Sequence, residues 1–222
     1  MKDKRKTVRG NEDAKEKSRE LSPAEEKRLR AFEELSESMI AQGYRRVELT
    51  VGIVKANAFA LLLLIPLLLV GIGLFLLINH TAGVSIGAMN PVLFFVVLIV
   101  LVVVHELIHG LTWAVFAEHH WADIEFGFMK QYLTPYCTCR VPLTRGQYIT
   151  GALMPLLVLG ILPMIAGILF GSMPVLFMGI IMADSAAGDI LIVRQIRRYR
   201  SEAGSVVYID HPTQAGGVIF EK

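Results

Sequence analysis

The chain has 222 residues, of which 54% are hydrophobic and 19% are charged, and its formal net charge at pH 7 is +2. This composition is too apolar for an ordinary soluble domain, and the small net charge gives no reason to expect a nucleic-acid-binding protein. The two cysteines, Cys137 and Cys139, are too few and too close together to form a disulfide framework. The composition therefore indicates a membrane protein with one folded domain and polar ends.

The N-terminal region is polar and strongly charged. Residues 1–20 mix Lys, Arg and Glu with almost no large apolar side chains, which predicts a disordered charged arm. The sequence Ser-Pro-Ala-Glu at residues 22–25 is typical of a capping box with proline at the first helical position. Apolar residues then recur at helical spacing, at Leu29, Phe32, Leu35, Met39 and Ile40. We therefore expect residues 21–56 to form an amphipathic helix and a lead-in to the first apolar stretch.

Four apolar stretches are each long enough to cross a bilayer. They are residues 57–78, 91–117, 148–170 and 174–193. In the third stretch, Pro155 and Pro163 would kink the helix. The sequence thus predicts an all-α membrane protein in which residues 57–193 form a domain with four transmembrane helices and residues 194–222 form a tail.

The distribution of Lys and Arg predicts the orientation of these helices. Of the 22 basic residues, fourteen lie in residues 1–56, three in 118–147 and five in 194–222. Because basic residues concentrate on the cytoplasmic side, we expect both termini and the 118–147 loop to be cytoplasmic. The predicted location is the cell membrane, with several passes through the bilayer and the amphipathic helix in the cytoplasm.

The second apolar stretch contains His-Glu-Leu-Ile-His, an H-E-x-x-H motif. His105 and His109 are four residues apart and share one face of a helix, so both imidazoles can reach one Zn²⁺. Glu106 can face a metal-bound water and act as its general base. The simpler interpretation is a pair of histidines that are hydrogen-bonded between helices without a metal.

The acids inside the apolar stretches favour the metal. Asp184 and Asp189 lie in the fourth stretch, and the four stretches contain no Lys or Arg that could neutralise them. His105 is fourteen residues into its stretch and Asp189 is fifteen residues into its own, so both lie roughly 21–23 Å from the outer boundary. We therefore predict Asp189 as the third ligand and expect Asp184 to form an interhelical or water-lined polar contact. His211, in the tail, stays a candidate for a group behind the ligands.

The 118–147 loop has the alternation of a β-hairpin. Polar and apolar residues alternate over residues 123–128 and again over residues 137–141, which predicts a small cytoplasmic hairpin beside the site. Its open edge could accept an extended peptide by strand addition, or the hairpin could be purely structural. Cys137 and Cys139 could form a soft metal pair, but two packed thiols on one strand face fit a single Cys-x-Cys better.

Several motifs together resemble a known family. They are HELIHG at residues 105–110, Tyr-Cys-x-Cys-Arg-x-Pro at 136–142, Met-Pro-Leu at 154–156, Gly-Asp-Ile at 188–190 and Asp-His-Pro-Thr at 210–213. Over roughly residues 35–222 the chain resembles the putative zincin peptidase family of small bacterial membrane proteins, which is in turn similar to site-2 proteases. The resemblance implies that His105, His109 and Asp189 bind zinc and that Glu106 is the catalytic base. Site-2 proteases have Leu-Asp-Gly with a preceding Asn–Pro feature where this chain has Gly-Asp-Ile, so the residues that position the substrate stay unassigned.

The sequence therefore predicts a membrane-embedded zinc metallopeptidase. Its substrate would be a peptide or membrane protein that is cleaved within or beside the bilayer, near the cytoplasmic face. The alternative is a non-catalytic metal-binding membrane protein that serves as a sensor or uses the metal structurally. A metal transporter fits less well, because no further acid or histidine continues a path through the outer half of the bilayer.

Overall fold

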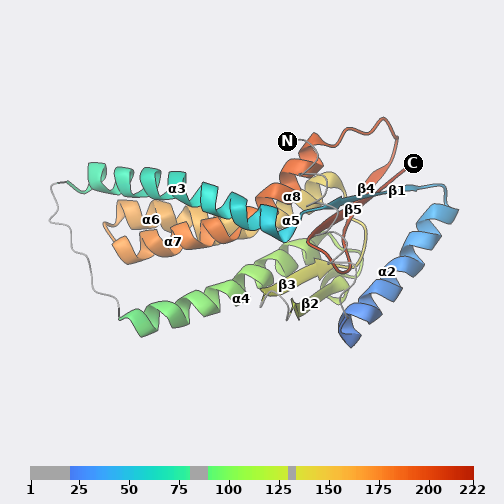
Figure 1. The fold of residues 1–222 in the computed structure, drawn as a ribbon, viewed down its shortest axis with the longest axis horizontal. Coiled ribbons are helices and arrows are strands. Elements are labelled where there is room, and N and C mark those ends of the chain that lie inside the picture. The colour runs from blue at the N-terminus through green and yellow to red at the C-terminus, as the bar shows by residue number, and fades with distance from the viewer. Residues whose placement is uncertain (1–20, 81–89, 130–133) are drawn as a thin grey trace, which may run out of the picture.

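The structure, a computed structural model, describes residues 21–80, 90–129 and 134–222. The arm expected at residues 1–20 lies outside these residues. Long apolar helices form one end of the elongated molecule, and short strands and an N-terminal helix form the other end (Figure 1). The candidate site lies where the two ends meet.

Among the described residues, three helical stretches are long and apolar enough to cross a membrane. They are α3 (Ile53–Ile78), α4 (Pro91–Phe116) and the continuous series α5 (Arg145–Pro155), the π-helix η2 (Leu156–Ile161) and α6 (Leu162–Leu169). A fourth would be the pair α7 (Met173–Ser185) and α8 (Ala187–Arg198), which meet at an angle of 45°. These helices are compatible with the four predicted spans, although the last is bent and extends beyond the predicted boundary at residue 193.

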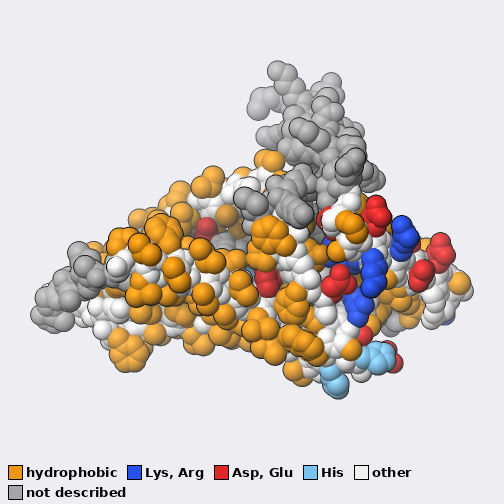
Figure 2. Space-filling model, turned by 90° about the horizontal axis from the view of Figure 1, so that it is seen from below, with side chains coloured by type: hydrophobic (Ala, Val, Ile, Leu, Met, Phe, Trp, Pro, Cys, Tyr) orange, Lys and Arg blue, Asp and Glu red, His pale blue; other side chains and the backbone are white. Residues whose placement is uncertain are grey.

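The surface agrees with this assignment. Apolar side chains cover the helical end, whereas charged side chains gather at the other end (Figure 2). Large apolar side chains on α3 and α4 point outward, and Leu61 and Val115 are each 70% exposed. A surface of this kind is stable against lipid and unfavourable against water.

The predicted capping box at the first helix is confirmed. At the start of α2 (Pro23–Ala41), the Ser22 hydroxyl accepts from the amide of Glu25, and the Glu25 carboxylate accepts from the amide of Ser22. The reciprocal bonds satisfy two amides that the first helical turn leaves free. At the start of α4, the Asn90 side chain accepts from the amide of Val92 at 2.9 Å.

Two antiparallel sheets lie at the polar end. The first is a hairpin of β2 (Ile124–Met129) and β3 (Thr134–Cys139), preceded by the 3-10 helix η1 (His120–Asp123), and it confirms the predicted hairpin. The second has the strand order β1-β5-β4, with β1 (Arg45–Thr50), β4 (Val206–Asp210) and β5 (Gly216–Glu221). The hairpin packs on α4, and the three-stranded sheet packs on α5 and α8.

The expectation of an all-α protein with one hairpin is therefore incomplete. Residues 45–50 were expected to belong to a lead-in and residues 206–221 to a tail, but they form one sheet. Arg45 pairs with Glu221, 176 positions away. A local alternation pattern carries no information about a partner at that distance, which is why the sheet could not be read from the sequence.

Three apolar clusters hold the parts together. One joins α2 to the three-stranded sheet through Phe32, Met39, Ile209, Val218 and Phe220. A second joins α3 to α6 and α7 through Phe75, Ile168, Leu176 and Ile180. The third joins α4, β3, α5, α8 and the sheet, and includes Trp113, Cys139, Leu143, Tyr148, Ile196, Tyr208 and Ile219. The third cluster lies directly beside the H-E-x-x-H motif and fixes the helices that carry the candidate site.

Candidate metal centre

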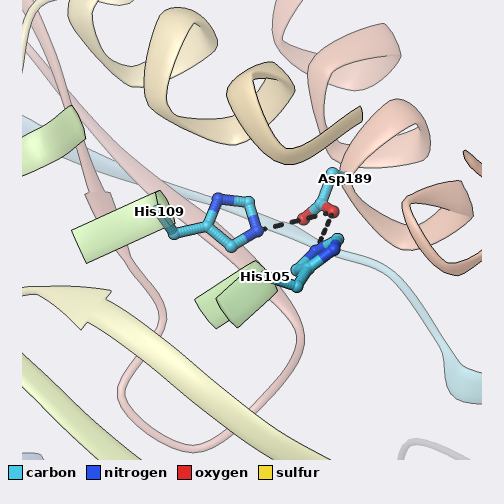
Figure 3. Close-up of side chains that lie close together, drawn as sticks. All are labelled: His105, His109 and Asp189. Atoms are coloured by element: carbon cyan, nitrogen blue, oxygen red, sulfur yellow. Dashed lines mark ion pairs between the residues drawn. The ribbon is translucent and has the colours of Figure 1, made fainter. Parts of the chain in front are cut away.

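The structure brings together the three predicted ligands. His105 and His109 are buried on one face of α4, and their ring centroids are 4.9 Å apart. Asp189 lies in the first turn of α8, where the bend after α7 turns the chain toward α4. Its Oδ2 atom is 3.4 Å from Nε2 of His105 and 3.6 Å from Nε2 of His109 (Figure 3). The depth argument from the sequence thus predicted the proximity of Asp189 to both imidazoles.

The separations between these atoms fit a shared metal ion. Both N···O distances are longer than a hydrogen bond, which is usually 2.7–3.2 Å. A tetrahedral zinc ion with bonds near 2.0–2.1 Å holds its ligand atoms about 3.3 Å apart. One ligand atom from each side chain lies within 4.8 Å of the other two, and among the described residues no other group of three or more such side chains does so. Two imidazoles and a carboxylate are a ligand set of zinc sites that keep an open position.

The third apolar helix orients the imidazole of His109. Nδ1 of His109 donates a hydrogen bond of 2.9 Å to the carbonyl oxygen of Gly151. This bond fixes the proton on Nδ1 and leaves Nε2 free to bind a metal. The ring also stacks on Trp113, with centroids 5.2 Å apart and planes 16° apart, and Trp113 donates from Nε1 to the carbonyl of Tyr148. His109 is therefore held at Nδ1 and on one face of its ring, whereas Nε2 faces Asp189.

His105 is held less completely. Its Nδ1 atom is buried and has no hydrogen-bond partner among the described residues. The orientation of this ring therefore depends on packing and on whatever its Nε2 atom contacts, which here is Asp189.

The predicted base lies beside the ligands. Glu106 is half-buried on α4, and its carboxylate is close enough to the backbone of Cys137 to interact electrostatically with it. Strand β3 therefore lies beside this carboxylate, which the sequence alone did not indicate. Glu106 lines the same cavity as His105, His109 and Asp189.

This cavity has a volume of about 230 Å³ and extends from the ligands to the polar end. Its far wall is formed by β3, by Arg28 of α2 and by the turn between β4 and β5. Arg28 donates from Nε to the carbonyl of Pro212 at 2.5 Å and from Nη1 to the hydroxyl of Tyr136, over whose ring it also lies. The amphipathic helix thus contributes to the site, a role that its sequence did not indicate.

A third carboxylate, that of Asp210, lines the cavity beside those of Glu106 and Asp189. Asp210 accepts from the Tyr148 hydroxyl at 2.5 Å and from the amide of Cys139 at 3.0 Å. Burial raises the pKa of Asp210 to about 6, although these two hydrogen bonds and His109 oppose the shift. The Asp-His-Pro-Thr motif at residues 210–213 was noted in the sequence, but nothing local showed that its aspartate would be buried near the ligands.

Asp184, Cys137 and Cys139 lie outside the metal-binding group of the described residues. Asp184 is not in the metal-binding group, and its Oδ1 atom is buried without a hydrogen-bond partner among the described residues, so the expected interhelical contact is absent for that oxygen. Cys137 and Cys139 are free thiols that share no metal-binding group with a third residue of the described chain. Cys139 packs in the apolar cluster beside Trp113, which supports the interpretation of packed thiols.

The part of the chain that carries the candidate site is similar to a known family. Residues 98–203 match the sequence model of a family described as putative zincin peptidase, which confirms the resemblance drawn from the motifs. The match contains His105, Glu106, His109 and Asp189, together with the hairpin, but neither Arg28 nor the turn after β4. Searches of curated proteins and of solved structures found no match. Over residues 98–203, just under half of the chain, the protein is therefore similar to the putative zincin peptidase family.

Proposed function

We propose that the chain is a membrane-embedded zinc metallopeptidase that hydrolyses a peptide bond near the cytoplasmic face. The observation that carries this proposal is the position of one carboxylate oxygen of Asp189 within 3.4 and 3.6 Å of two imidazole nitrogens, with Glu106 lining the same cavity. The match of residues 98–203 to the model of a putative zincin peptidase family supports zinc as the ion.

His105, His109 and Asp189 would hold the zinc. When bound, zinc acts as a Lewis acid toward the scissile carbonyl and makes a water molecule acidic enough to lose a proton near neutral pH. Glu106 takes that proton as general base and later passes it to the nitrogen of the leaving amine as general acid. Glu106 lines the cavity together with Cys137 of β3, so its carboxylate is at the place where both transfers would occur.

The substrate is a peptide segment in or beside the bilayer. The cavity joins the apolar helices to the polar end of the molecule, so a bond at the membrane surface could enter it. The excess of Lys and Arg in residues 1–56 and 194–222 supports a cytoplasmic position for that end. Strand β3 lines the cavity and could bind an extended peptide along its edge.

The proposal is tested with protein purified in detergent. Zinc content and cleavage of a peptide library are measured for the wild type, Glu106→Gln and Glu118→Gln. Glu118→Gln is the matched control, since Glu118 follows the end of α4 and does not line the cavity. We expect all three proteins to bind zinc and only Glu106→Gln to lose cleavage, by about 10²- to 10⁴-fold. Zinc binding without cleavage by the wild type would instead favour the non-catalytic alternative, a metal sensor or structural metal protein.

A further inference from the structure

The turn between β4 and β5 brings one more histidine to the cavity. His211 lines the same cavity as the three ligands and Glu106. The preceding residue, Asp210, is close enough to His109 and Asp189 to interact electrostatically with both. The turn lies outside the segment that matches the family, so no role for His211 follows from that match.

The protonation of this ring is fixed by its own turn. Nδ1 of His211 accepts hydrogen bonds from the amides of Thr213, at 3.2 Å, and Gln214, at 3.0 Å. A ring nitrogen that accepts cannot carry a proton, so the proton of the neutral imidazole is on Nε2. Burial lowers the pKa of His211, which keeps the ring neutral at physiological pH.

The Nε2–H group of His211 is an unused donor. The described residues provide no hydrogen-bond partner for it, and it is not among the fully buried atoms that lack one. The atom is therefore not fully buried, and it belongs to a residue that lines the cavity. A polar donor that stays free at the wall of a cavity is available to a ligand in that cavity.

The turn that carries this donor is rigid. The amide of His211 donates to the carbonyl of Gly216 at 3.0 Å, and Arg28 binds the carbonyl of Pro212. The amide of Val51 donates to the carbonyl of Ala215 at 2.8 Å. The donor is therefore oriented before a substrate arrives, which is the condition for a hydrogen bond to stabilise a transition state.

We propose that His211 is a catalytic residue that donates its Nε2–H to the oxygen of the scissile carbonyl. This inference rests on the proposed peptidase function. As the water oxygen bonds to the carbonyl carbon, the π electron pair moves onto the carbonyl oxygen, and the new negative charge strengthens the bond from Nε2–H. The electron pair on this oxygen then re-forms the C=O bond as the C–N bond breaks. The amine leaves with the proton carried by Glu106. His211 keeps its own proton throughout.

Two substitutions separate the role of His211 as a hydrogen-bond donor from its role as the acceptor that holds the turn. In His211→Asn, the side-chain oxygen can replace Nδ1 as acceptor for the turn amides, but no group reaches the position of Nε2. In His211→Gln, the terminal amide can replace the Nε2–H donor, but the acceptor for the turn is lost. The two variants therefore test the catalytic and the structural role separately.

We expect His211→Asn to keep the thermal stability and zinc affinity of the wild type while kcat falls by about 10²- to 10³-fold with little change in KM. His211→Gln should recover part of kcat despite lower thermal stability. A phosphonate peptide, which resembles the tetrahedral state, should bind His211→Asn about 10²- to 10³-fold more weakly than it binds the wild type. The uncleaved substrate, measured on the Glu106→Gln background, should bind equally well with either residue at position 211.

This inference would be overturned if His211→Asn cleaved the substrate and bound the phosphonate like the wild type while His211→Gln had lost activity. The proposed peptidase function would then still stand. A wild-type protein that binds zinc without cleaving any peptide would overturn the proposed function, and this inference with it.

Discussion

Nδ1 of His109 lies 2.9 Å from the carbonyl oxygen of Gly151, so that a backbone atom of one long apolar helix orients a side chain of another. In a regular helix this carbonyl would accept from the amide four residues later. That residue is Pro155, which has no amide hydrogen. The proline therefore leaves an acceptor free at the place where His109 requires one, and the π-helix η2 follows directly.

Replacing Pro155 with Ala should weaken zinc binding. The new amide at position 155 can donate to the Gly151 carbonyl and compete with His109 for it. Loss of an outer partner of a metal ligand typically reduces metal affinity by about 10- to 100-fold, and we expect a change of this size. Competition with a fluorescent zinc chelator measures it. Pro163→Ala, in the same helical series, is the control and should bind zinc like the wild type, because the carbonyl four residues before Pro163 is that of Leu159 and not the acceptor of His109.

Replacing Gly151 with Ala should disrupt the same support sterically. The Trp113 indole, which stacks on His109, occupies the space that a Cβ atom at position 151 would need. Overpacking of this kind lowers the free energy of unfolding by about 1–3 kcal/mol, and displacement of Trp113 should also lower zinc affinity. Gly146→Ala on the same helix has open space around it and should be neutral or stabilising. Equal thermal stabilities for the two variants would argue against this packing.

The two acids of the α7–α8 region should behave differently. Asp189→Ala removes a predicted ligand and should reduce zinc affinity by roughly 100-fold or more, beyond the effect of an outer partner. Asp184→Ala removes a carboxylate whose Oδ1 is buried without a partner, so zinc affinity should be unchanged and thermal stability should not fall. Similar zinc affinities for these two variants would exclude Asp189 as a ligand.

The thiols of β3 should be unreactive in the folded protein. Burial raises the pKa of Cys137 far above its ordinary value of 9.0, and it raises the pKa of Cys139 to about 11. The native state thus favours the protonated thiols. The contribution of the protonated thiols to the free energy of unfolding is fully present below pH 9. It is lost as the pH rises toward 11 and beyond. We expect iodoacetamide to alkylate the native protein at pH 9 at least about tenfold more slowly than the unfolded protein, because the thiolate is the reactive form. Equal rates would mean that the thiols are ionised in the native state.

The sequence was enough to predict that His105, His109 and Asp189 lie together, but it did not indicate which other residues line the cavity. The spacing of His105 and His109 and the depth of Asp189 follow from the fixed rise of helices that begin at one membrane boundary. Arg28 and His211 reach the cavity only because α2 packs on a sheet whose strands are distant in sequence. The hydrogen bond from His109 to the Gly151 carbonyl can be predicted only when the packing of α5 on α4 is known.

The order of the strands has a consequence for biosynthesis. β5 lies between β1 and β4, although it is the last of the three in the chain, so the sheet cannot close until residue 221 has left the ribosome. The nascent protein carries His105, His109 and Asp189 long before that point. The turn that holds His211 is completed only by pairing with β5, through the bond from His211 to Gly216. A peptidase built in this way would acquire its ligands early in translation and its full cavity last, which limits what it could cut before folding is complete.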